Sequence, residues 1–511
     1  MSFMDKLKET LNEEFNVSVT ENGALGYRTS GKELLDINFM VSSMRNETKE
    51  KVEKRFAKVL LENKLLAVKW LFYAADVRGG VGERRLFRIC MLFLANNEPE
   101  IAKKLIPLIP EYTRWDNLLV LLDSKNTEIK SYVIDFISAT LAEDVKNLKN
   151  KSSVSLCAKW MPSANASSNE TKRYAKILIN GLKTNERSYR KTLSALRSYI
   201  DVVEIKMSSK QWNKIKYSAV PSKANLIYNN AFLRNDEERR REYLESLKKG
   251  ETKINASTLF PHDIVHRYSS SSWTRHLNPL DTTLEELWKN LPDYVKDNSN
   301  TICVADGSGS MTSTIGNTHI SCLSVANALA IYFSERCSGC FKDKYITFSE
   351  HPKLVDFSNC STLRDKIQMA LRHSEIANTN IEATFDLLLT TAVKNNLNQE
   401  DMPQNILILS DMEFDGATSG NPNKKLFREI ANKYAEHGYK LPRLVFWNIC
   451  NRSGTIPIRE NELGVALVGG FSPAIVNMVL SNSTDPLECL LEQLNSERYK
   501  PVEEAIISCL A

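Results

Sequence analysis

Hydrophobic side chains recur every three or four residues through the first half of the chain, which is the spacing of an amphipathic helix. The segments 61–76 (LENKLLAVKWLFYAAD) and 187–200 (RSYRKTLSALRSYI) both show this period. In the second segment Arg187, Arg190 and Arg197 fall on a different face from the apolar side chains. Such segments follow one another without a strand pattern between them. The sequence therefore predicts a succession of paired helices.

The pattern changes at about residue 298, where short apolar segments begin to alternate with amphipathic ones. The expected strands are 300–306, 342–349, 404–411, 443–450 and 464–470. The expected helices among them are 318–336, 380–395 and 424–439. Strands and helices in alternation predict a doubly wound α/β sheet that is largely parallel.

A chain of 511 residues is too long for one hydrophobic core, so we expect a multi-domain protein. Residues 1–295 are predicted to form an α-helical domain, a solenoid or ring of the kind that HEAT repeats build. Residues 296–511 are predicted to form the α/β doubly wound, Rossmann-like domain.

Charge is divided unequally between these two parts. Residues 1–295 carry 48 Lys and Arg against 37 Asp and Glu, whereas residues 296–511 carry 19 against 25. Within the first part, residues 146–223 hold 17 basic and four acidic side chains. This asymmetry favours a polyanion as the partner of the helical part, although a solvated basic face without a partner has the same composition.

The glycine-rich stretch GGVGER, with Gly79, Gly80 and Gly82, lies between two predicted helices. It lacks the Gly-Lys-Ser/Thr ending of a phosphate-binding loop, and no strand precedes it. We therefore expect a tight helix–helix turn and no nucleotide site.

Oxygen-bearing side chains follow two of the predicted strands. Asp306, Ser308 and Ser310 come directly after the strand 300–306, and Asp411 ends the strand 404–411. Ligands of doubly wound sheets bind in the crevice outside the carboxyl ends of the strands. A third loop at this crevice carries Thr379. Two carboxylates and three hydroxyls are the hard oxygen donors that Mg²⁺ prefers.

This arrangement resembles the metal-ion-dependent adhesion site of von Willebrand factor A domains, whose pattern is Asp-x-Ser-x-Ser, a distant Thr and a later Asp. The resemblance implies a bound Mg²⁺, or Mn²⁺ or Ca²⁺ in its place, and an open coordination position for an acidic group of a partner protein. It also implies that Ser308, Ser310 and Thr379 contact the ion. Asp306 and Asp411 would often act through waters or through hydrogen bonds to the ligands.

Two positions depart from that family pattern. Asn378 and Met412 stand where the family often has glycine. Glu413 and Asp415 add negative charge, which either tightens cation binding or belongs to a solvated loop. A relic site that holds the loops together without a metal is the alternative interpretation.

A basic helical part followed by a von Willebrand A domain is the layout of the Ro autoantigen and the TROVE-domain family. The stretches YAADVRGGVGERRLF, RWDNLLVLL, SLCAKWMPSANASS, YRKTLSALRSYIDVVE, AVPSKANLIYNNAF and LFPHDIV resemble an uncharacterised TROVE-like branch. This resemblance implies binding of structured or noncoding RNA by the helical domain. On charge alone, the RNA-binding candidates are Lys172, Arg173, Lys176, Arg187, Arg190, Lys191 and Arg197. The nearby aromatic residues Tyr174, Tyr189, Trp212 and Tyr217 either stack on bases or, as we favour, pack between helices.

Other function classes find little support in the sequence. The acidic, amphipathic first segment leads us to expect no export signal, and the apolar runs are too short for us to expect a membrane span. Ten scattered cysteines suit a reducing compartment, so we expect a cytoplasmic protein. The seven histidines form no ligand-spaced pair and no acid–base constellation, so we expect no enzymatic activity. The remaining alternative to RNA binding is a protein-interaction or assembly module that uses only the metal site.

Overall fold

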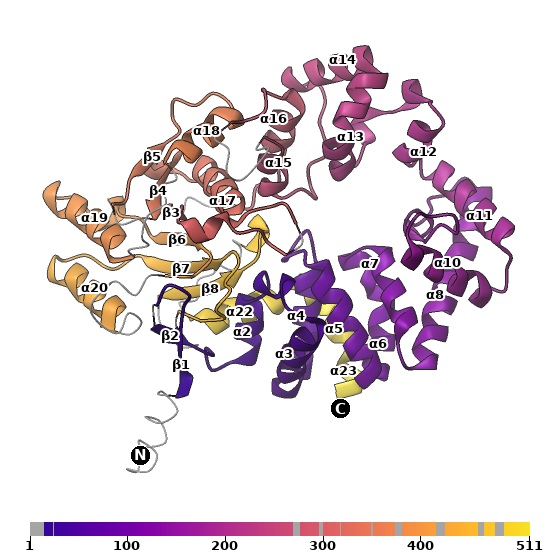
Figure 1. Ribbon diagram of the computed structural model, residues 1–511, viewed down its shortest axis with the longest axis horizontal. Helices are drawn as coiled ribbons and strands as arrows, with labels where there is room; N and C mark the ends of the chain where they lie inside the picture. The colour runs from indigo at the N-terminus through magenta and orange to yellow at the C-terminus, as the bar shows by residue number, and fades with distance from the viewer. Residues whose placement is uncertain are drawn as a thin grey trace, which may run out of the picture. The chain divides into compact units, whose positions relative to one another are not determined.

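The structure is a computed structural model that describes residues 15–23, 25–268, 276–295, 300–316, 318–348, 351–373, 381–414, 425–457, 464–475 and 485–510 (Figure 1). The chain forms two compact units, and each is built from two separate stretches of sequence. An α/β unit comprises residues 1–48 and 259–496, and a helical unit comprises residues 49–258 and 497–511. This division differs from the predicted boundary between residues 295 and 296. The N-terminal residues 1–48 belong to the α/β unit, and the C-terminal residues 497–511 belong to the helical unit.

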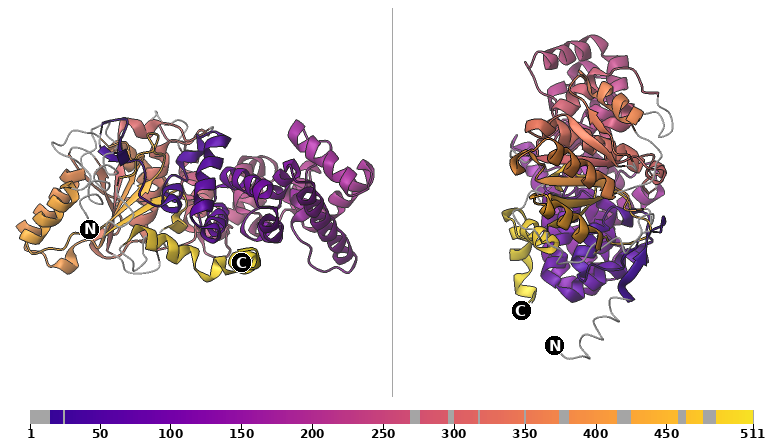
Figure 2. Two further views of the ribbon diagram at one scale, coloured as in Figure 1. Left: turned by 90° about the horizontal axis from the view of Figure 1, so that it is seen from below. Right: turned by 90° about the vertical axis from the view of Figure 1, so that its left-hand side faces the viewer.

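The helical unit contains the following α-helices: α3 (Lys49–Glu62), α4 (Lys64–Ala75), α5 (Arg84–Asn97), α6 (Pro99–Leu105), α7 (Ile109–Tyr112), α8 (Thr127–Lys149), α9 (Cys157–Trp160), α10 (Asn169–Gly181), α11 (Glu186–Tyr199), α12 (Val203–Ser208), α13 (Ser222–Asn235), α14 (Glu237–Lys248) and α23 (Lys500–Leu510). Short 3₁₀ segments connect them: η2 (Ile106–Leu108), η3 (Trp115–Asp123), η4 (Trp212–Lys214), η5 (Tyr217–Ala219) and η10 (Glu497–Tyr499). Among helices that are neighbours in sequence, α3 packs on α4, α4 on α5, α5 on α6 and α13 on α14, whereas α10 and α11 each pack against α8. The C-terminal helix α23 packs against α4 and α6 (Figure 2).

Polar caps and one glycine set the helix boundaries. The Asn63 side chain accepts a hydrogen bond from the Leu66 amide at 3.0 Å, which begins α4 and interrupts the single helix predicted over 61–76. The glycine-rich stretch is a turn between α4 and α5, as predicted. A Cβ atom on Gly80 would lie 2.0 Å from the Tyr73 carbonyl oxygen, so no other residue fits there without moving the backbone.

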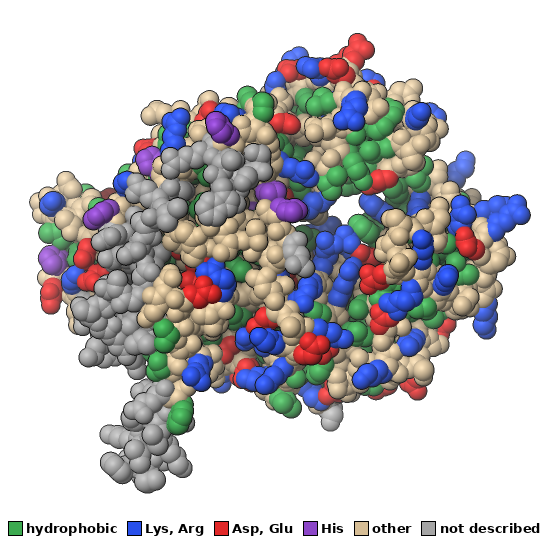
Figure 3. All heavy atoms as spheres, in the orientation of Figure 1, with side chains coloured by type: hydrophobic (Ala, Val, Ile, Leu, Met, Phe, Trp, Pro, Cys, Tyr) green, Lys and Arg blue, Asp and Glu red, His purple; other side chains and the backbone are tan. Residues whose placement is uncertain are grey.

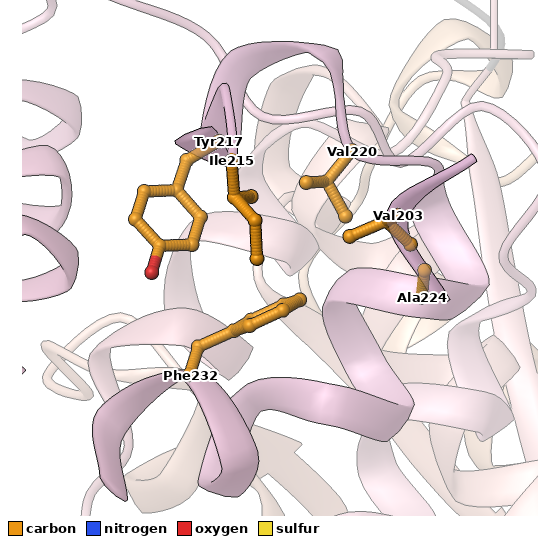
Figure 4. Packing of buried hydrophobic residues seen from close by; sticks show 6 residues of the cluster. All are labelled: Val203, Ile215, Tyr217, Val220, Ala224 and Phe232. Carbon is orange, nitrogen blue, oxygen red and sulfur yellow. The ribbon is translucent and has the colours of Figure 1, made fainter. Parts of the chain in front are cut away.

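Helices α12 and α13 and the segment between them share a hydrophobic cluster. It consists of Val203, Ile215, Tyr217, Val220, Ala224 and Phe232 (Figure 4). The Tyr217 and Phe232 rings meet edge to face, with their centres 5.4 Å apart. Trp212 packs against the same cluster. Tyr174 and Tyr189 are also buried, so three of the four aromatic side chains pack inside the unit, as we favoured over base stacking, whereas Trp212 is only partly buried.

The α/β unit is built around a six-stranded mixed sheet of order β5-β4-β3-β6-β7-β8 (Figure 1). Its strands are β3 (Thr301–Asp306), β4 (Lys344–Phe348), β5 (Leu354–Asp356), β6 (Asn405–Ser410), β7 (Arg443–Asn448) and β8 (Val465–Gly469). All neighbouring pairs are parallel except β4 with the edge strand β5. The five predicted strands are confirmed, and β5 is an additional short strand.

Helices of this unit are α2 (Glu33–Phe39), α15 (Pro261–Tyr268), α16 (Thr282–Lys289), α17 (Cys322–Arg336), α18 (Leu363–His373), α19 (Ile381–Lys394), α20 (Lys425–Glu436) and α22 (Pro486–Leu494). Its short 3₁₀ segments are η1 (Ser43–Arg45), η6 (Gly309–Thr312), η7 (Gly339–Phe341), η8 (Gln399–Asp401) and η9 (Pro473–Ile475). A small antiparallel pair, β1 (Val17–Val19) and β2 (Leu25–Tyr27), precedes them. Helix α17 is buried almost throughout because it packs against β3, β4 and β6. Within the described part of the chain, no helix is both long and apolar enough to cross a membrane.

We expect Phe232→Ala to lower the free energy of unfolding of the helical unit by about 3–5 kcal/mol, because it removes a buried ring and leaves a cavity. The measurement is urea denaturation followed by circular dichroism. Ile227→Ala is the matched control on the same helix, since Ile227 is 55% exposed and Phe232 is 0% exposed. Equal losses for the two variants would contradict the assignment of Phe232 to the core.

Candidate metal centre

The centre of the candidate site is the junction of two neighbouring strand ends. Strands β3 and β6 are parallel neighbours, with Ala305 opposite Leu409. Their last residues, Asp306 and Ser410, therefore reach the same edge of the sheet, and the Ser410 hydroxyl donates to Asp306 Oδ2 at 2.6 Å. Asp411 follows directly. From β3 the chain continues to β4 and β5 on one side, whereas β6, β7 and β8 follow on the other side. Ligands of such sheets usually bind at this switch in strand order.

The loop after β3 folds back over this junction. The Ser308 amide donates to Asp306 Oδ1 at 2.9 Å, and the Ser308 and Ser310 hydroxyl oxygens lie 2.9 Å apart. The Ser310 side chain lies near Asp411 and acts to lower the pKa of that carboxyl group. The structure thus brings together Asp306, Ser308, Ser310 and Asp411, whereas Thr379 lies outside the described residues.

Both carboxylates of the site are buried. Asp306 is 1% exposed and Asp411 is 0% exposed. Burial, and then the nearby charge of Asp411, raise the pKa of Asp306 to about 7. Burial also raises the pKa of Asp411, although Arg452 and several hydrogen bonds oppose this effect. Two buried carboxyl groups so close to each other favour a neighbouring positive charge.

Arg452 supplies such a charge within the structure. Its Nη1 lies 3.1 Å from Asp411 Oδ2 and 3.4 Å from the Ser310 carbonyl oxygen, and its Nε donates to Glu21 Oε2 at 2.9 Å. Burial by itself would lower the pKa of Arg452, but the bonds to Glu21 and Asp411 outweigh burial and raise it. Arg452 was not among the site residues predicted from the sequence. The signal was available, because Arg452 follows the predicted strand 443–450 and therefore lies at the same sheet edge.

Glu413 has a structural role in these loops. It is 1% exposed, and its carboxylate accepts hydrogen bonds from the amides of Glu21, Arg452 and Ser453 at 2.7–2.8 Å. Its oxygens are therefore engaged by backbone groups. The other added acid of the sequence, Asp415, lies outside the described residues.

The donor set fits a hard divalent cation. Two serine hydroxyls and two carboxyl groups converge on one place, and oxygen donors of this kind suit Mg²⁺ better than zinc. In the described ranges, no group of three or more His, Cys, Asp and Glu side chains is placed to hold a metal ion. Such a group is not required here, because hydroxyls provide half of the four described donors.

In the helical unit, the predicted RNA-binding residues lie on α10 and α11 but differ in their surroundings. Arg173 forms a two-pronged ion pair with Asp123, with N–O distances of 2.5 and 2.9 Å. The Arg190 Nη1 atom lies 3.8 Å from Glu186 Oε1, so these two side chains form an ion pair on α11. Arg197 is half-buried and donates to the carbonyl oxygens of Ala158 and Met161, so it holds the α9 segment in place.

The other four candidates remain accessible for a ligand. Lys176, Arg187 and Lys191 are exposed, and Lys172 is partly exposed. Within the described residues, none of these four forms an ion pair. Figure 3 shows Lys and Arg side chains gathered over α11.

A cavity of about 680 Å³ also lies in the helical unit, close to α9. Its charged lining residues are Arg88, Asp116, Lys159, Glu170, Arg197 and Glu204. Three positive and three negative side chains balance each other. This cavity therefore adds no net positive charge to the surface of α10 and α11.

Comparisons with known proteins give families without an assigned function. Residues 300–505 match a domain of unknown function, DUF7788, and residues 122–301 match another, DUF2828. The chain is similar to the uncharacterized protein L728 of Acanthamoeba polyphaga mimivirus, with 29% identity over 524 residues. That similarity covers 95% of this chain and 89% of the viral protein. The two matched segments meet at residues 300–301, where β3 begins.

We expect Glu413→Ala to lower the free energy of unfolding of the α/β unit by about 2–3 kcal/mol, because three amide donors lose their acceptor. Thermal and urea denaturation check this result. Glu436→Ala is the matched control, since Glu436 is exposed on α20. A wild-type stability of the Glu413 variant would show that these amides find water instead.

Proposed function

We propose that the protein is a Ro-like RNA-binding protein with two binding sites and no enzymatic activity. On this proposal the helical unit is a TROVE-like HEAT-repeat domain that binds structured or noncoding RNA. The α/β unit is a von Willebrand A-like domain that binds an acidic residue of a partner protein through Mg²⁺. The ten cysteines of the chain are all free thiols, which supports a cytoplasmic location of the protein.

The RNA half of the proposal is carried by the accessible basic residues of α10 and α11. Lys172 and Lys176 are four residues apart and therefore lie on the same face of α10. Arg187 and Lys191 have the same relation on α11. Four positive side chains in two consecutive helices provide phosphate contacts without base selectivity. The packing of α3 on α4, α4 on α5, α5 on α6 and α13 on α14 supports the repeat architecture in these parts of the unit.

The metal half is carried by the hydroxyl pair beside two buried carboxyl groups. Ser308 and Ser310 present neutral oxygens, and Asp306 is held by Ser410 and by the Ser308 amide. A bound Mg²⁺ would provide an electrophilic position for a carboxylate of the partner. The protein's own residues orient the donors and keep Asp306 and Asp411 away from bulk water.

We expect replacement of Lys172, Lys176, Arg187 and Lys191 by glutamine to weaken binding of a structured RNA with a single-stranded 3′ end. Each lost phosphate contact should also reduce the slope of log affinity against log salt by about 1. Fluorescence anisotropy at several salt concentrations measures both quantities. The matched control replaces four exposed basic residues elsewhere in the unit: Arg234, Arg241, Lys248 and Lys249. Equal effects of the two quadruple variants would reject this surface as the RNA-binding site. If the wild type does not bind RNA even at low salt, RNA binding is refuted, and the alternative function is a protein-interaction module that uses only the metal site.

We expect the double change Ser308→Ala and Ser310→Ala to abolish Mg²⁺ binding and to leave RNA affinity unchanged. The reason is that two neutral donors disappear from the α/β unit while the helical unit keeps its charge. Isothermal titration calorimetry with Mg²⁺ and anisotropy with RNA measure the two effects separately. Parallel loss of both activities would contradict the assignment of two independent sites.

A further inference from the structure

The loop that carries Arg452 is held firmly at several points. The Arg452 and Ser453 amides donate to Glu413 Oε1 at 2.7 and 2.8 Å. The Asn451 side chain donates to the Thr455 carbonyl oxygen at 2.6 Å and closes the loop internally. Ile456 then pairs with Tyr27 through two backbone hydrogen bonds of 2.8 Å. The backbone at Arg452 is thus held next to the candidate site, and the long arginine side chain extends from this fixed point.

The guanidinium connects an inner carboxylate with an outer one. Asp411, on the inner side, is 0% exposed. The Glu21 side chain, on the outer side, is 49% exposed, and that of Arg452 is 23% exposed. The same guanidinium also reaches Ser310 and Ser313, with Nη1 lying 3.3 Å from the Ser313 hydroxyl. Arg452 therefore touches two of the proposed metal-binding residues, Ser310 and Asp411.

A guanidinium and a divalent cation that share one carboxylate repel each other. The repulsion is strong at a buried site, because the effective dielectric constant is low there. The Asp411 oxygen that faces Arg452 cannot serve both cations at full strength. Glu21 offers the arginine a second, half-exposed carboxylate, and this pair is already formed.

We propose that Arg452 is a built-in competitor of the metal ion, a positioning residue that neutralises Asp411 in the absence of metal and sets the cation affinity of the site. This inference rests on the metal half of the proposed function. When a divalent cation binds, Arg452 gives up Asp411 and keeps Glu21. The arginine thereby weakens metal binding and favours the state without metal.

The test is direct binding of Mn²⁺ to the full chain, followed by the electron paramagnetic resonance signal of free Mn²⁺. We expect Arg452→Gln to bind Mn²⁺ at least about tenfold more tightly than the wild type, because the competing charge is removed. The matched control is Arg336→Gln in the same unit. Arg336 pairs with Glu335 at 3.3 Å, and its removal changes the net charge equally. An equal gain in the control would overturn the proposal, since the effect would then reflect net charge alone.

The serine double variant separates this inference from the proposed function. If the wild type and Arg452→Gln bind Mn²⁺ equally, and the serine variant does not bind, the metal site stands and the competition is refuted. If neither the wild type nor Arg452→Gln binds Mn²⁺ while circular dichroism shows both to be folded, the metal half of the proposed function fails together with the inference.

Glu21→Gln provides a second test that leaves Arg452 in place. This change removes the carboxylate that receives the displaced arginine, so we expect Mn²⁺ affinity to fall about threefold. Unchanged or tighter binding in this variant would contradict the proposal. This arm keeps the inference testable if Arg452→Gln does not fold.

Discussion

The burial of two carboxyl groups at adjacent strand ends is the constraint on which the α/β unit depends. Parallel pairing of β3 with β6 places Asp306 and Asp411 at the same sheet edge, and both are almost completely buried. A buried charge is costly unless it is paired or hydrogen-bonded. The surrounding loops meet this cost: Ser410 and the Ser308 amide bind Asp306, and Arg452 binds Asp411.

The same constraint explains why the N-terminal segment belongs to the α/β unit. Glu21 binds Arg452, and Thr20 donates to the Phe414 carbonyl oxygen at 2.7 Å. Further along, α2 lies so close to β8 that a Cβ atom on Gly469 would be 2.3 Å from the Phe39 carbonyl oxygen. The loops around Asp306 and Asp411 are therefore completed by the segment that carries Thr20 and Glu21, which lies more than 250 residues before β3 in sequence.

Local patterns predicted the strands, the main helices and the convergence of Asp306 with Asp411, because alternation and strand-end chemistry are encoded within short windows. The interleaving of the two units was not predictable in this way. It depends on long-range pairs, such as Lys69 with Glu503 at 2.5 Å in the helical unit. The use of Arg197 to bind carbonyl oxygens was also missed, since a basic residue on a polar helix face looks the same in sequence whether it binds its own backbone or a phosphate.

Met412 forms an unusual turn directly before Glu413. Met412 adopts a φ of 64°, a left-handed conformation that favours glycine and costs a side chain about 1–2 kcal/mol. The resulting turn directs the Glu413 carboxylate back toward the Arg452 and Ser453 amides, and so fixes the loop that carries the guanidinium. Here the Met412 side chain is 1% exposed, so its burial offsets part of the backbone cost. The unusual turn, the buried Glu413 and the arginine at Asp411 therefore form one connected arrangement that supplies positive charge to a site built of oxygen atoms.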